Sequence, residues 1–168
     1  MMSFVLRPIN SSDVDWIFDA CQDPLIQQWT QIPRPYTRDH ATSFAKDLGG
    51  DLAVWAITSE SSPLPFGVIG VHSVEAGVAD IGYWVAHWGR GKGAARSALA
   101  LLVELLKEWP EVRTIEAKIG EGNTASQRTV LGEGFIQTDA QGLSCRCGDS
   151  EISAVSYQLS LKKNLPLL

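Results

Sequence analysis

The middle of the chain reads Arg90-Gly91-Lys92-Gly93-Ala94-Ala95. The small side chains in this segment leave the main-chain N–H groups uncovered. The first turn of a helix has N–H donors without intrahelical partners and carries a partial positive charge, so it suits a phosphate group. Arg90 and Lys92 add positive charge beside it. The segment therefore predicts an anion-binding loop that opens a helix, with an ordinary strand-to-helix turn as the alternative.

The sequence changes its hydrophobic period across this segment. Residues 78–85 alternate apolar side chains at 79, 81, 83 and 85, which is typical of a strand with one buried face. After the segment, apolar residues fall at helical spacing as far as Trp109, and Pro110 ends the run. Neither the G-x-x-x-x-G-K-[ST] pattern nor the dinucleotide pattern G-x-G-x-x-G fits the segment. These two phosphate sites are therefore excluded.

Further motifs follow the loop in a fixed order. The run Arg-x-x-Gly-x-Ala at 90–95 precedes a helix, a strand, Asn123-x-x-Ser126 and Gly134-Phe135. In this order and spacing the chain resembles the GCN5-related N-acetyltransferase (GNAT) superfamily. It is most similar to the branch of ribosomal-protein N-terminal acetyltransferases of the RimJ/RimL type. Four shorter motifs favour this branch: Leu6-Arg7-Pro8, Asp23-Pro24 with Trp29, Pro35-Tyr36-Thr37-Arg38, and Gly82-Tyr83-Trp84-Val85.

The order of elements predicts the α/β class, in detail an α+β mixed sheet. We expect strands at about 4–7, 52–58, 66–74, 78–85, 113–119, 135–138 and 152–161. We expect helices at about 11–21, 37–48, 95–109 and 123–133, and loop or short helix around Pro24, Pro33 and Pro35. Such an order favours a largely antiparallel, twisted sheet with helices on both faces. The resemblance implies the GNAT fold, in which the sheet is splayed at its centre and leaves a cleft for the cofactor.

Length, composition and charge limit the class of protein further. The 168 residues fit one domain, 1–168, with a substantial core. The net charge of −5 argues against nonspecific nucleic-acid binding and is compatible with a protonated amine as partner. No apolar stretch reaches the about 20 residues that cross a bilayer, and residues 1–10 lack a signal-peptide pattern. We therefore expect a cytoplasmic monomer or homodimer without nucleic-acid or membrane partners.

The three cysteines do not indicate a metal site. Cys145 and Cys147 form a C-x-C pair, which makes no conventional zinc site without two further ligands nearby. With Cys21 they are expected to be reduced thiols, and an oxidation-sensitive Cys145/Cys147 pair is the alternative. No metal is predicted.

The resemblance implies acetyl-CoA as the acetyl donor. Its pyrophosphate would bind the amides of Gly91, Gly93, Ala94 and Ala95, beside Arg90 and Lys92. Its pantetheine arm would add to the edge of the preceding strand at Trp84 and Val85, through backbone hydrogen bonds. Asn123 would bind the pantetheine or fix the helix entrance. Arg128 would pair with a phosphate or remain a solvated charge.

Transfer to an amine needs a base and an acid. An ammonium group has no lone pair, so a base or a water must take its proton. Asp80 is the candidate base, because it matches the position of the acidic base in the resembled histone acetyltransferases. Alternatively, Asp80 is only a solvated residue of a strand. His72 and His87 are other possible bases. The departing thiol has a pKa of about 8.5 and needs a proton donor. Ser126 is the candidate acid, because it matches the Asn-x-x-Ser motif of the resembled branch. Alternatively, Ser126 only begins the helix, and a water donates the proton.

The acceptor side is predicted from two aromatic residues. Trp29 and Tyr36 would wall the acceptor pocket or, alternatively, cover the core. The resemblance makes a protein N-terminal α-amine the leading acceptor, with a small-molecule amine still open. We expect direct attack of a primary amine through a ternary complex; the competing hypothesis is a noncatalytic acyl-CoA-binding regulatory module.

Overall fold

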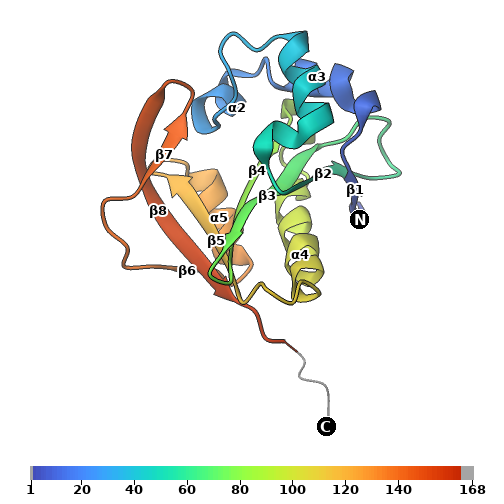
Figure 1. The fold of residues 1–168 in the computed structure, drawn as a ribbon. Coiled ribbons are helices and arrows are strands. Elements are labelled where there is room, and N and C mark those ends of the chain that lie inside the picture. The colour runs from blue at the N-terminus through green and yellow to red at the C-terminus, as the bar shows by residue number, and fades with distance from the viewer. Residues whose placement is uncertain (1, 164–168) are drawn as a thin grey trace.

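The computed structural model describes residues 2–163, which form an eight-stranded mixed sheet with helices on both faces (Figure 1). The strand order is β1-β2-β3-β4-β5-β8-β6, and β7 pairs with β8 beside this path. Among the strands of the described residues, only β4 and β5 pair in parallel. The strands are β1 (Val5–Pro8), β2 (Ala53–Thr58), β3 (Gly67–Glu75), β4 (Val78–Val85), β5 (Thr114–Gly120), β6 (Ile136–Gln137), β7 (Ser144–Cys147) and β8 (Ser150–Ser160). The predicted fold class is confirmed.

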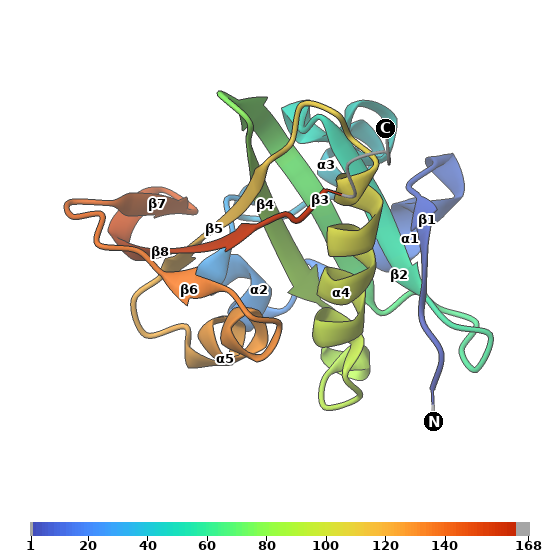
Figure 2. The same cartoon turned by 90° about the horizontal axis from the view of Figure 1, so that it is seen from below.

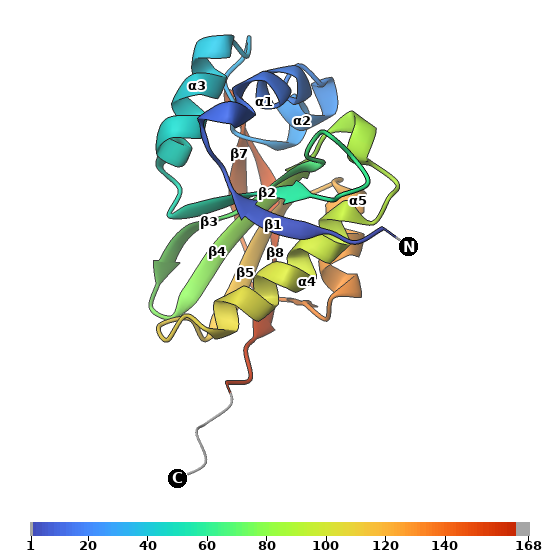
Figure 3. The ribbon, with the colours of Figure 1, turned by 90° about the vertical axis from the view of Figure 1, so that its right-hand side faces the viewer.

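Three helices cover one face of the sheet and two cover the other (Figure 3). The first group is α1 (Val14–Ala20), α2 (Pro24–Trp29) and α3 (Arg38–Asp47); the second is α4 (Ala94–Lys107) and α5 (Thr124–Gly132). Short 3₁₀ segments lie at η1 (Ser11–Asp13), η2 (Leu48–Gly50) and η3 (His87–Gly89). Each group of helices packs on the sheet through its own hydrophobic core.

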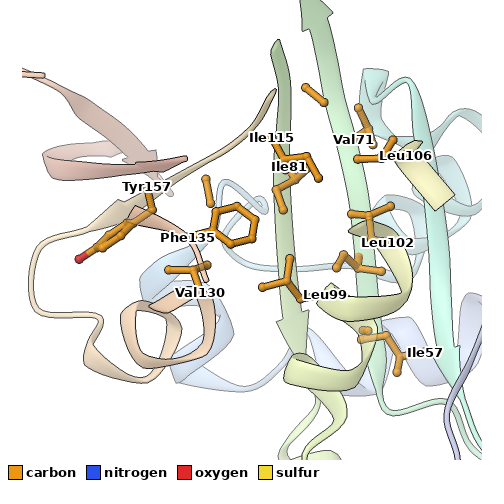
Figure 4. Close-up of a cluster of buried hydrophobic side chains, with 14 of the residues drawn as sticks. Ile57, Val71, Ile81, Leu99, Leu102, Leu106, Ile115, Val130, Phe135 and Tyr157 are labelled. Atoms are coloured by element: carbon orange, nitrogen blue, oxygen red, sulfur yellow. The ribbon is translucent and has the colours of Figure 1, made fainter. Parts of the chain in front are cut away.

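The core between α4 and the sheet follows from the helical spacing in the sequence. Leu99, Leu102 and Leu106 are fully buried on one side of α4. Figure 4 shows them facing strand residues that include Ile57, Val71, Ile81 and Ile115. Burying each leucine contributes about 1.5–3 kcal/mol. This packing fixes α4, and with it the loop that precedes α4, against the middle of the sheet.

The sheet opens between β4 and β5. The parallel pairing runs from Val78↔Thr114 to Ile81↔Ala117 and stops there. Beyond this point β4 still pairs with β3, and β5 still pairs with β8. The two strands diverge from their paired ends in Figure 2. The predicted splay is confirmed, and it leaves residues 82–85 of β4 without a partner strand on the β5 side.

One local element falls within an expectation that left two structures open, and another was not predicted. Helix α2 forms where a loop or short helix was expected, because Asp23 caps it by accepting a hydrogen bond from the Leu25 N–H and Pro24 occupies its first turn. Strand β7 was not predicted. It is a polar edge strand that pairs with β8 in a hairpin, so it shows no apolar alternation.

Candidate active site

Two cavities open where β4 and β5 part. We name them the loop cavity, of about 520 Å³, beside residues 89–96, and the sheet cavity, of about 690 Å³, over β3, β4 and β5 between α3 and β7. The residues that line both cavities are Trp29, Thr30, Tyr83, Trp84, Asn123 and Ser126. The two cavities therefore meet at the opening of the sheet, and molecules held in each of them would come together there.

The loop cavity is lined by main chain at the start of α4. Gly91 and Gly93 have φ values of 71° and 77°, in the left-handed region that favours glycine, and a Cβ at either would find no atom within 4 Å. Within residues 2–163, the N–H groups of Gly91, Gly93, Ala94 and Ala95 donate no hydrogen bond. These four donors remain available to an anion, and the cavity gives the anion room.

The two arginines of the loop cavity are already paired. Arg90 Nη2 lies 2.7 Å from Asp23 Oδ2, on a carboxylate that caps α2. Arg96, which the sequence analysis did not single out, places Nε 2.6 Å from Glu133 Oε1. The main-chain amides, rather than the guanidinium groups, are therefore the free donors of this cavity.

The other two cations predicted for the cofactor line neither cavity. Lys92 Nζ donates a hydrogen bond of 2.8 Å to the Trp88 carbonyl and lies 5.5 Å from the centroid of the Phe66 ring. Arg128 is exposed on α5. The sequence shows the charge of such residues but not the direction in which their side chains point.

Ser126 stands at the junction of the cavities, in the first turn of α5. The Asn123 side chain caps this helix by accepting from the Ser126 N–H at 3.4 Å. The Ser126 hydroxyl lies beside the Tyr83 hydroxyl, and against the larger effect of burial its hydrogen bond acts to lower the pKa of Tyr83. Trp84 and Val85 lie across the opening on β4, where both line the loop cavity. The structure thus brings together the residues predicted for the pantetheine arm and for the acid.

Tyr83 is a junction residue for which the sequence predicted an apolar strand position and membership of the motif at 82–85, but no role in the site. Its hydroxyl donates to the Ser126 carbonyl at 3.2 Å and so links β4 to α5 across the opening. Burial raises the pKa of Tyr83 to about 12, so the phenol stays protonated near neutral pH. Strand alternation gives no sign of such a bond, since it does not distinguish a tyrosine from another apolar side chain.

Trp29 and Tyr36 occupy different depths of the sheet cavity. Trp29 ends α2 and lines both cavities; a Cβ at Gly120 would come within 3.2 Å of its ring. Gly120 therefore lets Trp29 lie over the end of β5. Tyr36 is only 6% exposed and packs in the core of α1–α3, yet it also lines the sheet cavity. Tyr36 therefore both lines the cavity and covers the core, which the sequence analysis gave as alternatives.

The sheet cavity has a charged floor. Lys118 Nζ lies 3.5 Å from Asp80 Oδ2 and 3.3 Å from Glu116 Oε1. Partial burial acts to lower the pKa of Lys118, but Asp80 and Glu116 raise it above its ordinary value. Asp80 therefore lies in the sheet cavity as the partner of a firmly protonated lysine.

A second charged pair lies beside Asp80. His72 Nδ1 is 2.7 Å from Asp51 Oδ1, and this bond raises the pKa of His72 above its ordinary value although burial opposes it. His87, the other histidine considered as a base, is exposed and lines neither cavity. Of the two alternative histidines, only His72 faces the site.

The cysteines form no metal cluster. No three side chains of His, Cys, Asp or Glu among residues 2–163 are grouped so that they could hold a metal ion. Cys145 and Cys147 place their sulfur atoms 3.9 Å apart on β7, and burial raises the pKa of Cys147 to about 11. Over the same residues, no helix is long and apolar enough to cross a membrane.

Comparison with known proteins identifies the family. Residues 3–136 match the model of the Acetyltransferase (GNAT) domain, so the chain belongs to the GNAT acetyltransferase family. It is an acetyltransferase that uses acetyl-CoA as its acetyl donor, as the family resemblance implied. Comparison with curated proteins gives no match.

Solved structures of RimL-type enzymes share the fold. The chain is similar to the RimL ribosomal L7/L12 α-N-protein acetyltransferase in complex with coenzyme A, with a TM-score of 0.81, 17% identity, and coverage of 95% of this chain and 94% of that chain. It is also similar to the acetyltransferase from Salmonella typhimurium that modifies the N-terminal serine of L7/L12, with a TM-score of 0.77, 17% identity, and coverage of 95% and 96%.

The chain is similar to the same degree to an acetyltransferase that is not described as acting on a ribosomal protein. The microcin C7 self-immunity acetyltransferase MccE, in complex with acetyl-CoA and AMP, has a TM-score of 0.82, 15% identity, and coverage of 94% of this chain and 92% of that chain. At these identities the likeness concerns the fold alone.

Proposed function

We propose that this single-domain enzyme transfers the acetyl group of acetyl-CoA to a primary amine by direct attack in a ternary complex. The observation that carries the proposal is the pair of cavities that share their lining at Ser126, because two molecules can then meet without a covalent acyl-enzyme. The leading acceptor is the α-amine of a protein or peptide, as in the RimL-type enzymes with the same fold. A small-molecule amine is the other acceptor class.

The loop cavity fits the donor. The free amides of Gly91, Gly93, Ala94 and Ala95 would hold the pyrophosphate, and residues 82–85 offer a strand edge for the amides of the pantetheine arm. When bound there, acetyl-CoA supplies an acetyl group that is activated as a thioester. Asn123 would support the arm from the opposite side, since it lines both cavities.

The chain's own residues would move the protons. Ser126 Oγ, half-buried at the junction, would donate a proton to the departing sulfur, and the bond from Tyr83 to the Ser126 carbonyl would hold α5 in position. The proton of the ammonium would go to a base of the sheet cavity, where Asp80 and His72 lie, or to a water there. Trp29 would enclose the acceptor amine from the side of α2.

A thiol-release assay tests the proposal. The enzyme is given acetyl-CoA with peptides that differ in their first residue and with a panel of small amines, and mass spectrometry locates the acetyl group. Each active peptide is paired with the same peptide blocked at its α-amine as a control. We expect thiol release with free peptides and none with blocked ones. Binding of acetyl-CoA without transfer to any amine would support the noncatalytic module instead.

A further inference from the structure

His72 lies at a β-bulge of β3, on the face of the strand that lines the sheet cavity. Val71 pairs with Ile81 and Ser73 pairs with Asp80, which are successive residues of β4, so His72 is an extra residue of β3 without a partner. Val68 and Gly70 line the same cavity, so His72 continues the regular alternation of β3, and the register changes only after it. Bulges are over-represented next to active sites. His72 lines the sheet cavity together with Asp80 and Gly82.

The bond with Asp51 orients the imidazole ring. Nδ1 lies 2.7 Å from a carboxylate oxygen, so in neutral His72 this nitrogen carries the hydrogen and donates it to Asp51. Nε2 then holds the free lone pair. An orienting carboxylate behind a histidine is the arrangement by which catalytic histidines are held in one tautomer.

The free nitrogen points toward the opening of the sheet. A Cβ at Gly82 would lie only 2.4 Å from His72 Nε2, so the ring lies directly over this glycine. Gly82 is the first residue of β4 beyond the last pair with β5, which is Ile81↔Ala117. His72 Nε2 therefore lies where the strands part, at the inner end of the strand edge that the pantetheine arm would follow.

Six charged or titratable groups face His72 from the elements around it. Asp51 binds it from the end of η2, while Asp80 on β4 raises its pKa and Lys118 on β5 lowers it. Asp47 of α3 lines the same cavity, as do His40 of α3 and Arg146 of β7. Asp80 is already engaged by Lys118, whereas Nε2 of His72 donates to and accepts from no described residue.

We propose that His72 is the catalytic base that takes the proton of the acceptor amine, with Asp51 as its positioning residue; this rests on the proposed function. Nε2 of neutral His72 receives one proton from the ammonium group. The freed lone pair bonds to the acetyl carbon while the carbon–sulfur bond breaks. The second nitrogen proton goes to the sulfur through Ser126, and His72 returns its proton to water. Asp80 then serves to hold Lys118.

The test compares four variants on the most active acceptor from the amine panel. His72→Gln keeps a side chain of similar reach that cannot accept a proton, and we expect kcat to fall about 10²-fold, the lower range for a general base. Asp51→Asn should lower kcat less and shift the acidic limb of the pH profile to lower pH. His87→Gln is the matched control and should match the wild type. A normal kcat in His72→Gln, or a loss of that size in Asp80→Asn but not in His72→Gln, would overturn the assignment.

Two further measurements separate this inference from the proposed function. Thermal shift with acetyl-CoA reports whether each variant folds and binds the donor, and we expect wild-type shifts in His72→Gln. NMR of the wild-type histidines needs no turnover: we expect His72 to carry its hydrogen on Nδ1 and to titrate above the ordinary histidine pKa of about 6.5. The opposite tautomer would overturn the inference even in an active enzyme. A wild type that transfers nothing would instead reject the proposed function.

Discussion

The loop cavity and the sheet cavity are built from different parts of the chain. The loop cavity consists mainly of consecutive main chain at the start of α4, and its two arginines are neutralised by Asp23 and Glu133. The sheet cavity has a floor of side chains from η2, β3, β4 and β5, with charges of both signs. The first cavity offers donors of fixed direction, whereas the second offers groups that can gain and lose protons.

In the proposed function, this difference separates recognition of the donor from the chemistry on the acceptor. Main-chain amides do not titrate, so the loop cavity should bind a diphosphate equally well over a broad pH range. The sheet cavity should respond to pH through His72, whose pKa is set by its neighbours. The expected effects of four changes, from the largest to the smallest, test this separation.

Gly93→Trp should abolish donor binding. The new side chain would occupy the space over the free amides, at a φ of 77° that only glycine tolerates well. At 100 times Kd, acetyl-CoA should add about 2.7 kcal/mol to the free energy of unfolding of the wild type, and nothing to the variant. Gly142→Trp is the matched control, since Gly142 has a φ of 68°, open space around it and a place outside both cavities. A retained thermal shift in Gly93→Trp would contradict the role of the loop cavity.

Ser126→Ala should slow turnover and leave donor binding intact. Loss of the proton donor at the junction should lower kcat about 10²-fold, with the KM for acetyl-CoA unchanged. Steady-state kinetics measures both parameters. Ser97→Ala is the control, because Ser97 lies on α4 outside both cavities. If Ser126→Ala kept full kcat, a water would be the donor.

Arg90→Gln should affect stability more than donor binding. The variant leaves the Asp23 side chain, which is 9% exposed, without its ion-pair partner, and this should lower the free energy of unfolding by about 1–3 kcal/mol. Denaturant unfolding measures the loss, and a double-mutant cycle with Asp23→Asn gives the interaction energy of the Arg90–Asp23 pair. A large rise in the KM for acetyl-CoA at unchanged stability would show instead that Arg90 binds a phosphate.

Charge changes beside His72 should move the pH profile in opposite directions. Lys118→Gln removes a positive charge, so the pKa of His72 rises and the acidic limb of kcat moves to higher pH; Asp80→Asn moves it to lower pH. Each shift should be about half a pH unit, as expected for partly solvated charges several ångströms apart. Lys107→Gln, on the outer side of α4 beside Glu104, is the control. Shifts of the same sign in both variants would exclude His72 as the titrating group.

The same contrast explains what the sequence could reveal. A main-chain binding site leaves its signature in consecutive small residues, so Gly91, Gly93 and the start of α4 were predictable from the sequence alone. The direction of Lys92 and the pairing of Arg90 with Asp23 were not, because they depend on packing between distant elements. The sheet cavity was hidden for the same reason, since Asp51, His72 and Lys118 belong to different elements and meet only in the folded sheet.

The resemblance supplied what periodicity could not. Strand alternation indicated β4 and β5, but their parting beyond Ile81 and Ala117 followed only from likeness to the family. The hydroxyl of Tyr83 and the bulge at His72 interrupt no hydrophobic pattern, so no pattern could reveal them. The strand β7 was not predicted because its polar sequence has no hydrophobic alternation.

His72, the extra residue in β3, could be removed without changing how the strands of the sheet pair. If residue 72 were deleted, Val71 and Ser73 would become neighbours opposite Ile81 and Asp80, which are neighbours already. No other side chain of the sheet would change face, and β2 would keep its register because its pairing with β3 ends at Val71. We expect that loss of a single codon would keep the sheet and remove the imidazole. With His72 as the proposed base, one mutational event would then separate the enzyme from a form about 10²-fold slower on the same scaffold.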